Sequence, residues 1–438
     1  MKSEVSIGLV CLARKTFDFK AAAKIYANII IDLNTIESVK WEIIPELIFE
    51  ISEAQDAAKH LVSRRIDAII CISGTFALGH LILELNKMIN KPILLWALEE
   101  LPYDGGKIRL NSICGVNLNA SNLYKSSVTN YTINIGSKVD QDWIDAIRVI
   151  KTLFTSHIAI IGYRAKGFFN LDVDELNLYK ELGILVDHYE LQEVFDFGTS
   201  DSEINKRLVQ LKQTFDLGEI STEQAHLVAE LIVKFDNFIS THDIDALAIR
   251  CWPEFADKFG ISPCAAMSVL QSEHKILTCE GDVLGAISML AHKAIGASYP
   301  FIADFSQVDF KEDFALLWHC GVASCNLSDG KCIKSLDSYF AGGKGVTADF
   351  VMKDGDISIL RFDYALGSYR IFLQKATGLP MEKLLKGTYV KVKFDNGVKN
   401  VLQKIIDNGI AHHISVVYGD FIKPFEIFAN IKGWEIIQ

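Results

Sequence analysis

The sequence lacks several features by which common classes of enzyme are recognised. No G-x-G-x-x-G turn opens a helix after a strand, so we do not expect a dinucleotide site. No G-x-S-x-G motif is present, which argues against an α/β-hydrolase. The nine cysteines form no C-x-x-C pair with zinc spacing. No apolar run reaches membrane-spanning length, and there is neither an internal repeat nor a low-complexity linker.

Positive charge is also scarce. There are 44 Lys and Arg residues against 55 Asp and Glu, which gives a net charge of -11. A nucleic-acid surface needs clustered basic residues, so we expect no nucleic-acid partner, whereas acidic residues favour a bound cation. An odd number of cysteines in apolar surroundings, such as Cys11 and Cys71, indicates a reducing compartment. Because residues 1–13 fit a first strand better than a signal peptide, we expect a cytoplasmic protein with no membrane segment.

The arrangement of apolar segments predicts the fold class. A chain of 438 residues is too long for one hydrophobic core. Strand-like runs at 5–12, 67–72 and 92–97 alternate with segments of helical periodicity, and this alternation resumes at 157–162. Such a rhythm is typical of parallel, doubly wound sheets.

The last third of the chain has a different pattern. From about residue 303, short runs tend to alternate apolar and polar residues, and the turn signal Asp354-Gly355 separates two of them, which indicates antiparallel strands. We therefore predict an α/β fold with two doubly wound parallel-sheet domains, followed by a C-terminal domain rich in antiparallel β. The predicted domains are residues 1–155, 156–302 and 303–438.

The stretch from Leu277 to Cys325 carries the strongest indication of chemistry. Glu280 and Asp304 each follow a short apolar run, and residues 283–295 between them have helical spacing. In a parallel sheet, both carboxylates would emerge at the same edge. Two carboxylates close together repel unless a cation lies between them or one holds a proton. The stretch therefore predicts a divalent metal site, an acid/base pair, or both, although capping a helix is the ordinary role for Glu280 taken alone.

Three histidines extend this set of candidates. His319 lies shortly after Asp304, and His412 and His413 are adjacent near the end of the chain. Carboxylate and imidazole together suit Mn²⁺, Fe²⁺, Co²⁺ or Zn²⁺. A lone histidine is more often structural than a ligand. Neighbouring side chains of an extended segment point in opposite directions, so we expect only one of His412 and His413 to face the site.

Other motifs give weaker signals. Ser73-Gly-Thr-Phe76 resembles a phosphate-type turn but lacks the Lys and second glycine of a P-loop. Arg164 and Lys166 are candidates to hold a phosphate or a substrate hydroxyl, although such cations more often belong to a solvated loop. Cys251 and Cys320 are candidate nucleophiles, although most cysteines in apolar surroundings are ordinary buried residues.

A series of short motifs runs through most of the chain: Gly74-Thr-Phe76, Pro92-Ile-Leu-Leu-Trp-Ala97, Asn111-Ser-Ile-Cys-Gly115, Ile161-Gly-Tyr-Arg-Ala-Lys-Gly-Phe168, Cys251-Trp-Pro-Glu-Phe255, Cys279-Glu-Gly-Asp-Val-Leu-Gly-Ala286, Phe301-Ile-Ala-Asp304, Trp318-His-Cys-Gly321 and Ala411-His-His413. In order and spacing, this series resembles the L-fucose and L-arabinose isomerase superfamily. The resemblance implies a three-domain subunit with an active site around a divalent metal, usually Mn²⁺, and assembly into a homo-oligomer, a trimer or a hexamer.

The resemblance also assigns roles to residues. It implies that Glu280, Asp304 and His413 are metal ligands and that the two carboxylates act as acid and base. Further ligands or substrate contacts are expected among four side chains: His319, His412, Arg164 and Trp252. An Asp at position 304 favours the fucose branch, because the arabinose branch tends to carry Glu there. The chain is shorter than is usual for either enzyme, which leaves the sugar open.

The chemistry expected of such a site can be stated from the residues. Moving a carbonyl between C1 and C2 of a sugar needs removal of a proton beside the carbonyl and its return to the neighbouring carbon. A metal stabilises the charge of the cis-enediol between these steps. We therefore predict a metal-dependent aldose–ketose isomerase with a monosaccharide substrate. The alternatives are a non-catalytic sugar-binding or sensor protein and a metal-dependent sugar aldolase or lyase.

Overall fold

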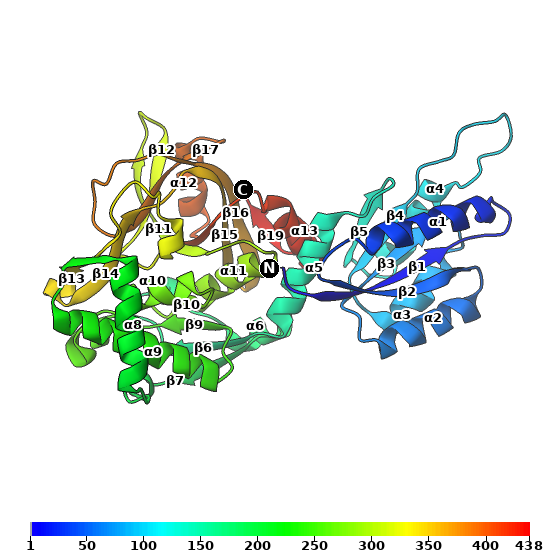
Figure 1. Cartoon of the computed structure of the whole chain (residues 1–438). Helices are drawn as coiled ribbons and strands as arrows, with labels where there is room; N and C mark the ends of the chain where they lie inside the picture. Colours follow the sequence, from blue (N-terminus) through cyan, green and yellow to red (C-terminus); the bar gives the residue numbers. More distant parts are fainter. Residues whose placement is uncertain (1) are drawn as a thin grey trace. The chain divides into compact units, whose positions relative to one another are not determined.

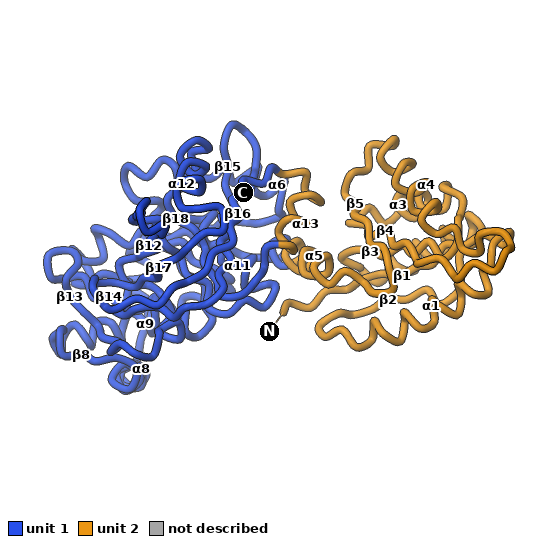
Figure 2. The backbone as a smooth tube through the Cα atoms, turned by 90° about the horizontal axis from the view of Figure 1, so that it is seen from above, with its two compact units in different colours: residues 1, 152–422, 435–438 blue, residues 2–151, 423–434 orange. Residues whose placement is uncertain are grey.

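The computed structural model describes residues 2–438, which divide into two compact units. The N-terminal unit comprises residues 2–151 and 423–434, and the larger unit comprises residues 152–422 and 435–438 (Figure 2). The elements within each unit can be followed in Figure 1. Within residues 2–438, no helix combines the length and the apolar character that crossing a membrane requires.

The N-terminal unit is built on a five-stranded parallel sheet with the order β2-β1-β3-β4-β5. Its strands are β1 (Val5–Leu12), β2 (Val39–Ile48), β3 (Ala68–Ser73), β4 (Ile93–Ala97) and β5 (Tyr131–Ile135). The helices that lie wholly or mostly in it are α1 (Phe19–Leu33), α2 (Ile51–Ser63), α3 (His80–Ile89), α4 (Ser112–Lys125), α5 (Gln141–Phe154) and α13 (Ile422–Lys432).

Both faces of this sheet are covered, which explains why its strands are apolar throughout. Leu95 of β4 packs in one core cluster with residues of α2, α3 and α4. Its neighbour Trp96 points to the opposite face, since side chains alternate along a strand. There it lines a cavity together with Ile29 and Leu33 of α1.

The larger unit begins with a four-stranded parallel sheet of order β10-β9-β6-β7. Its strands are β6 (His157–Ile161), β7 (Leu185–Tyr189), β9 (Ala246–Ile249) and β10 (Ile276–Thr278). The α-helices of this unit are α6 (Glu175–Leu182), α7 (Leu191–Phe195), α8 (Asp201–Thr214), α9 (Thr222–Thr241), α10 (Cys264–Ser272), α11 (Val283–Ala294) and α12 (Val398–Asp407). Short helical turns are η1 (Phe169–Leu171), η2 (Phe255–Phe259), η3 (Cys325–Leu327) and η4 (Ala341–Gly343).

The second sheet of the larger unit has ten strands in the order β19-β16-β15-β18-β11-β12-β17-β14-β13-β8. They are β8 (Asp216–Glu219), β11 (Phe301–Asp309), β12 (Phe314–His319), β13 (Ser335–Phe340), β14 (Gly345–Val351), β15 (Gly355–Ala365), β16 (Ser368–Leu379), β17 (Thr388–Phe394), β18 (His413–Tyr418) and β19 (Glu435–Ile437). An additional antiparallel pairing joins β16 to β17. It closes β16, β15, β18, β11, β12 and β17 into an antiparallel ring.

The predicted fold class is confirmed, with two parallel sheets followed by a mostly antiparallel one. One expectation about the key stretch is wrong. Glu280 follows β10 of the parallel sheet, but Asp304 lies within β11, which pairs antiparallel with β12 and β18 rather than with β10. The two carboxylates therefore come from different sheets. The division into two compact units does not separate residues on either side of 303, since residues 152–422 belong to one unit. The domain boundary expected near residue 303 therefore stays a prediction.

Candidate active site and metal centre

Glu280 lies on a turn that follows a parallel strand. β10 ends at Thr278, and both Glu280 and Gly281 have positive φ angles, of 63° and 74°. A Cβ atom at position 281 would lie 2.6 Å from Arg164 Cα, so glycine is what lets the neighbouring backbone approach so closely. The backbone N–H of Ala165 donates to the Glu280 carbonyl oxygen at 3.0 Å. These contacts define the turn that carries the Glu280 side chain.

The antiparallel ring brings Asp304 and His413 together. Asp304 pairs directly with His413 between β11 and β18, and with Trp318 between β11 and β12. Directly paired residues project from the same face of a sheet. His319 follows Trp318 at the end of β12, and one of its ring nitrogens lies within 4.8 Å of ligand atoms of Asp304 and His413. Residues distant in the sequence thus converge through strand pairing.

His413 is the residue at which the two carboxylates meet. Its Nε2 atom lies 3.6 Å from Glu280 Oε2 and 3.6 Å from Asp304 Oδ1. On the other side of the ring, Nδ1 lies 2.9 Å from Asp282 Oδ2. An ionised carboxylate only accepts hydrogen bonds, so Nδ1 donates to Asp282, and Nε2 is the ring nitrogen that faces Glu280 and Asp304. In metal sites, carboxylates orient ligating histidines in this way.

Asp282 was not predicted from the sequence. It is fully buried, and its Oδ1 atom caps α11 by accepting from the Gly285 N–H at 2.9 Å. Its Oδ2 atom accepts hydrogen bonds from His413 and from the buried Arg361. Burial raises the pKa of the Asp282 carboxyl, but the Arg361 charge and the His413 hydrogen bond outweigh burial and hold this pKa well below its usual range. The only indication in the sequence was that Asp282 lies two residues after Glu280. An Asp just before a helix is usually an ordinary N-cap residue, so this position did not indicate a role in the site.

Both adjacent histidines face Glu280, so the expectation that only one would do so is wrong. His412 Nε2 lies 3.1 Å from Glu280 Oε2, and Asn170 Nδ2 donates to His412 Nδ1 at 3.2 Å. Because β18 begins at His413, His412 precedes the extended segment and the alternation rule does not apply. Burial raises the pKa of the Glu280 carboxyl, but the His412 hydrogen bond and the neighbouring histidines outweigh burial and lower this pKa.

The two other predicted contacts, Trp252 and Arg164, differ in their surroundings. Trp252 lines the cavity beside Glu280, and its Nε1–H donates to Glu280 Oε1 at 3.4 Å. The Arg164 guanidinium pairs with Asp172 and lies 5.1 Å and 5.4 Å from the ring centres of Tyr163 and Phe169. Trp252 therefore touches a candidate catalytic group directly, whereas Arg164 is held by residues of its own loop.

Four buried cysteines gather beside these residues. Cys264 Sγ lies 3.5 Å from Cys320 Sγ, and Cys320 Sγ lies 3.2 Å from His319 Nδ1. The thiols of Cys251 and Cys320 are close enough to Cys279 to affect its pKa. Hydrogen bonds among these thiols lower the pKa of Cys320 and raise the pKa values of Cys264 and Cys279. The sequence pointed to Cys251 and Cys320 only as single residues, because their convergence depends on the fold.

These side chains surround a cavity of about 100 Å³. Its walls contain the two carboxylates, three of the cysteines and three aromatic side chains; the lining residues are Cys251, Trp252, Ser262, Cys264, Glu280, Asp304, Trp318, His319, Cys320 and Phe340. Ligand pockets usually have volumes of roughly 300 to 1,000 Å³. The cavity thus has room for an ion and a few reacting atoms.

The donor atoms at this cavity fit a divalent metal. Asp304 Oδ1 is buried without a hydrogen-bond partner, which is costly for a carboxylate oxygen. With Glu280 Oε2 it flanks His413 Nε2 at 3.6 Å on each side. Within residues 2–438, the donor atoms that lie within 4.8 Å of one another form two groups, Glu280 with His412 and His413, and Asp304 with His319 and His413. Ligand atoms around a metal with bonds of roughly 2.1 Å lie roughly 3 Å apart, so one ion shared by both carboxylates requires them to move toward each other. Mixed oxygen and nitrogen donors suit Mn²⁺, Fe²⁺, Co²⁺ or Zn²⁺.

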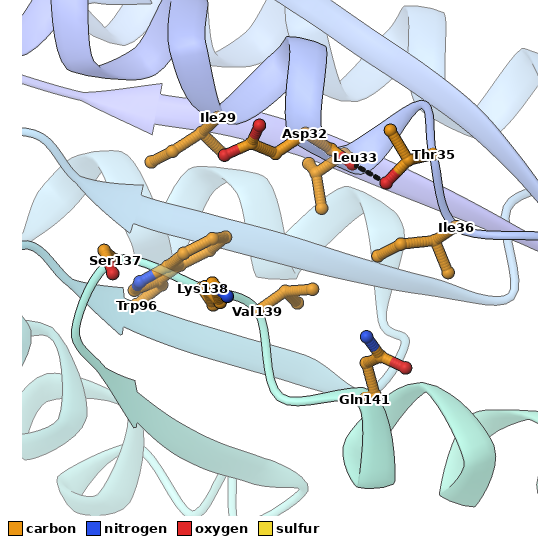
Figure 3. Close-up of a pocket in the computed structure, with 10 residues that line it drawn as sticks. All are labelled: Ile29, Asp32, Leu33, Thr35, Ile36, Trp96, Ser137, Lys138, Val139 and Gln141. Atoms are coloured by element: carbon orange, nitrogen blue, oxygen red, sulfur yellow. Dashed lines mark hydrogen bonds between the residues drawn. The ribbon is translucent and has the colours of Figure 1, made fainter.

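A larger cavity, of about 280 Å³, belongs to the N-terminal unit (Figure 3). Ile29 and Leu33 of α1 and Trp96 of β4 line it. Lys138, just before α5, and Gln141, the first residue of α5, also line it. Its walls contain neither histidine nor cysteine, and none of the potential metal-binding groups within residues 2–438 includes a residue of this cavity. The candidate site is therefore identified by converging carboxylates and histidines rather than by cavity size.

Comparisons with known proteins identify sugar isomerases as similar proteins. A family model described as "Fucose/sulfoquinovose isomerase, N-terminal domain" matches residues 8–153. A sulfoquinovose isomerase from Priestia megaterium is 27% identical over 439 residues, which cover 94% of each chain. Another from Alkalicoccus urumqiensis is 25% identical over 398 residues, covering 87% of this chain and 88% of that protein. An ABC transporter solute binding protein from Bacillus halodurans covers 68% of this chain and 91% of its own, at 11% identity and a TM-score of 0.18, which is too low to carry an argument.

The resemblance found in the sequence is confirmed by the family model and the curated relatives. Residues 8–153 match the N-terminal domain model of the fucose/sulfoquinovose isomerases, and the chain is similar to curated sulfoquinovose isomerases over most of its length. The family-model match ends before any of the candidate site residues, so their individual roles stay predictions.

Proposed function

We propose that this protein is a metal-dependent aldose–ketose isomerase that acts on a monosaccharide through a cis-enediol. The observation that supports this most strongly is the meeting of Glu280 Oε2 and Asp304 Oδ1 at His413 Nε2, 3.6 Å from each, beside a cavity. The activity named for the relatives from Priestia and Alkalicoccus makes sulfoquinovose the first substrate to test.

The proton transfers fall to the two carboxylates. An aldose becomes a ketose when a proton leaves the carbon beside the carbonyl and a proton returns to the neighbouring carbon. We assign these steps to Glu280 and Asp304, the two carboxylates that line the cavity. Trp252 and His412 each hold one oxygen of Glu280, which fixes its orientation. A divalent cation, when bound, supplies stabilisation for the negative charge of the enediol oxygens.

The residues that would hold this cation are Glu280, Asp304 and His413. His319 is a further candidate, since it belongs to the same cluster as Asp304 and His413. Asp282 orients His413 by accepting a hydrogen bond from its Nδ1–H. We propose Mn²⁺ as the first metal to test, because the family resemblance favours it and the mixed donor set admits it.

Activity measurements test this proposal directly. Ketose formation from sulfoquinovose and a panel of aldoses is measured with protein treated with a chelator and then with Mn²⁺. We expect no turnover without metal, recovery with Mn²⁺, and rates roughly 10²- to 10⁴-fold lower in Glu280→Gln and Asp304→Asn. Unchanged rates in both variants would reject the assignment. Product fragments smaller than the substrate would identify an aldolase or lyase, and binding without turnover would identify a sugar-binding or sensor protein.

Two further predictions complete the proposal. We propose a homo-oligomer, a trimer or hexamer as the family resemblance implies, and the cavity of about 100 Å³ supports this, because a whole sugar needs more walls than one copy supplies. Sedimentation or light scattering measures the number of subunits.

We also propose a cytoplasmic location, which the nine free thiols within the described residues support, since a reducing compartment keeps cysteines unpaired.

A further inference from the structure

We propose that Cys264 and Cys320 are a covalent modification site, at which peroxide forms a reversible disulfide in the wall of the candidate active site. The two Sγ atoms lie 3.5 Å apart. A disulfide needs a sulfur–sulfur distance of about 2.05 Å, so the atoms must approach by roughly 1.5 Å. A displacement of this size is within reach of side-chain rotation with small backbone shifts.

The two cysteines come from elements that are distant in the sequence. Cys264 is the first residue of α10, and Cys320 follows the last residue of β12, His319. Both positions are at the ends of their elements, where the backbone has fewer ladder or helix hydrogen bonds to break than inside them. A bond between them would join the start of a helix to the end of the strand that carries His319.

The cavity gives an oxidant access to this pair. Cys264, Cys320 and Cys251 line the cavity, whereas Cys279 is fully buried. Of the pair, Cys320 keeps 7% of its surface exposed and Cys264 keeps 1%, so a molecule as small as hydrogen peroxide meets Cys320 before Cys264. Cys264 Sγ, 3.5 Å from Cys320 Sγ, is then placed to react with the oxidised sulfur.

The chemistry balances with peroxide as the oxidant. Cys320 Sγ attacks one peroxide oxygen, the oxygen–oxygen bond breaks, and water leaves with the thiol proton, which gives a sulfenic acid at Cys320. Cys264 Sγ then attacks Cys320 Sγ, the sulfur–oxygen bond breaks, and a second water leaves with the Cys264 proton. The two thiols lose two electrons in total, and the peroxide gains them. A thiol reductant reverses the change.

The disulfide would change the site in a defined way. Cys320 Sγ now lies 3.2 Å from His319 Nδ1, and the Cys320 backbone N–H donates to the same nitrogen at 2.9 Å. Drawing Cys320 toward Cys264 disturbs both contacts and therefore the position of His319. This consequence rests on the proposed function, whereas formation of the bond does not.

The chemical test uses the reduced full-length protein and hydrogen peroxide. Remaining thiols are alkylated, and the digested protein is examined by mass spectrometry. We expect one linked peptide pair containing Cys264 and Cys320, the loss of two hydrogens per chain, and reversal by dithiothreitol. Cys264→Ser and Cys320→Ser should each abolish the link. Cys251→Ser, in the same cavity, and Cys114→Ser, at the one exposed cysteine among residues 2–438, should keep it.

Three results would overturn the proposal: no linked peptide at any peroxide concentration, a link mapped to Cys251 and Cys279 instead, or direct formation of sulfinic acid at Cys320 without a linked intermediate. The wild-type protein decides each of these, so a variant that folds poorly does not affect the outcome. Ketose formation is measured in parallel, and we expect at least a tenfold fall that dithiothreitol restores. If the reduced protein makes no ketose, the proposed function fails while the peptide result still decides the modification site.

Discussion

Two glutamates that follow parallel strands, one in each unit, have very different surroundings. Glu100 comes shortly after β4 and accepts hydrogen bonds from three backbone N–H groups, those of Leu101, Leu110 and Asn111. Burial raises the pKa of its carboxyl, but these backbone hydrogen bonds outweigh burial and lower it. Its oxygens are therefore engaged in holding the 100–111 loop in place.

Glu280 comes shortly after β10, and its partners are side chains. Trp252 and His412 donate to it, and His413 Nε2 lies 3.6 Å from it and 3.6 Å from Asp304. Two acidic residues at equivalent places in a β–α unit thus serve different purposes. A carboxylate bonded by backbone amides stabilises a loop, whereas one bonded by imidazole and indole groups beside a second carboxylate is available for chemistry.

The largest expected effect comes from removing the charge of each glutamate. Glu280→Gln should lower ketose formation roughly 10²- to 10⁴-fold, because the variant cannot exchange a proton with substrate. Glu100→Gln should leave the rate within a factor of about three, because its oxygens contact only its own loop. Steady-state kinetics on both purified variants measures the difference. Equal losses of rate in the two variants would mean that Glu280, like Glu100, acts only by stabilising the structure.

A second prediction concerns Asp282, which both caps a helix and bonds His413. Asp282→Asn should weaken divalent metal binding roughly 10- to 100-fold, because the amide cannot hold the His413 Nδ1 proton as a carboxylate does. Asp174 caps α6 in the same manner, accepting from Asn177 N–H at 3.0 Å, and provides the matched control. Asp174→Asn should leave metal affinity unchanged in titration calorimetry. Similar affinity in both variants would mean that Asp282 supports the fold, through the α11 cap and Arg361, and does not act on metal binding.

The smallest effect is a dependence of stability on pH that arises at Glu100. Its pKa is lower in the folded chain than in the unfolded chain, so its contribution to stability is present above the unfolded pKa of about 4.3 and is lost as the pH falls through the folded value. As the pH falls below about 5, the wild-type protein should therefore lose more free energy of unfolding than Glu100→Gln. Urea unfolding at a series of pH values measures this difference. Parallel curves for the two proteins would contradict it.

Much of this architecture could be predicted from the sequence. Uniformly apolar runs such as Ile93–Ala97 indicate strands covered on both faces, and turn signals such as Asp354-Gly355 indicate antiparallel strands. Glu280 and Asp304 could be singled out as candidates because each follows an apolar run, and His413 because it belongs to a pair of adjacent histidines and matches a ligand position of the resembled family. The structure places His413 Nε2 3.6 Å from each carboxylate, while the two carboxylates belong to separate groups of neighbouring donor atoms.

The supporting residues could not be predicted in this way. Arg361 lies in the middle of β15, where a charged residue would be expected to face solvent, yet it is fully buried against Asp282. This pairing joins positions far apart in the sequence, and no local periodicity encodes it. The orientation of His412 depends on where β18 begins, which pattern reading does not fix to a single residue. The same holds for the thiol cluster, whose members come from four separate segments.

The closed ring of six strands has a consequence for ions of different radius. Asp304 and His413 are opposite each other on hydrogen-bonded neighbouring strands of this ring, so their separation is fixed by the backbone. Glu280 stands on a short turn outside the ring. If an ion binds as proposed, a change in its radius is accommodated chiefly by movement of that turn. Substitutions in the turn that leave Asp282 and its pairing with Arg361 of β15 in place should therefore shift ion preference while the ring stays intact.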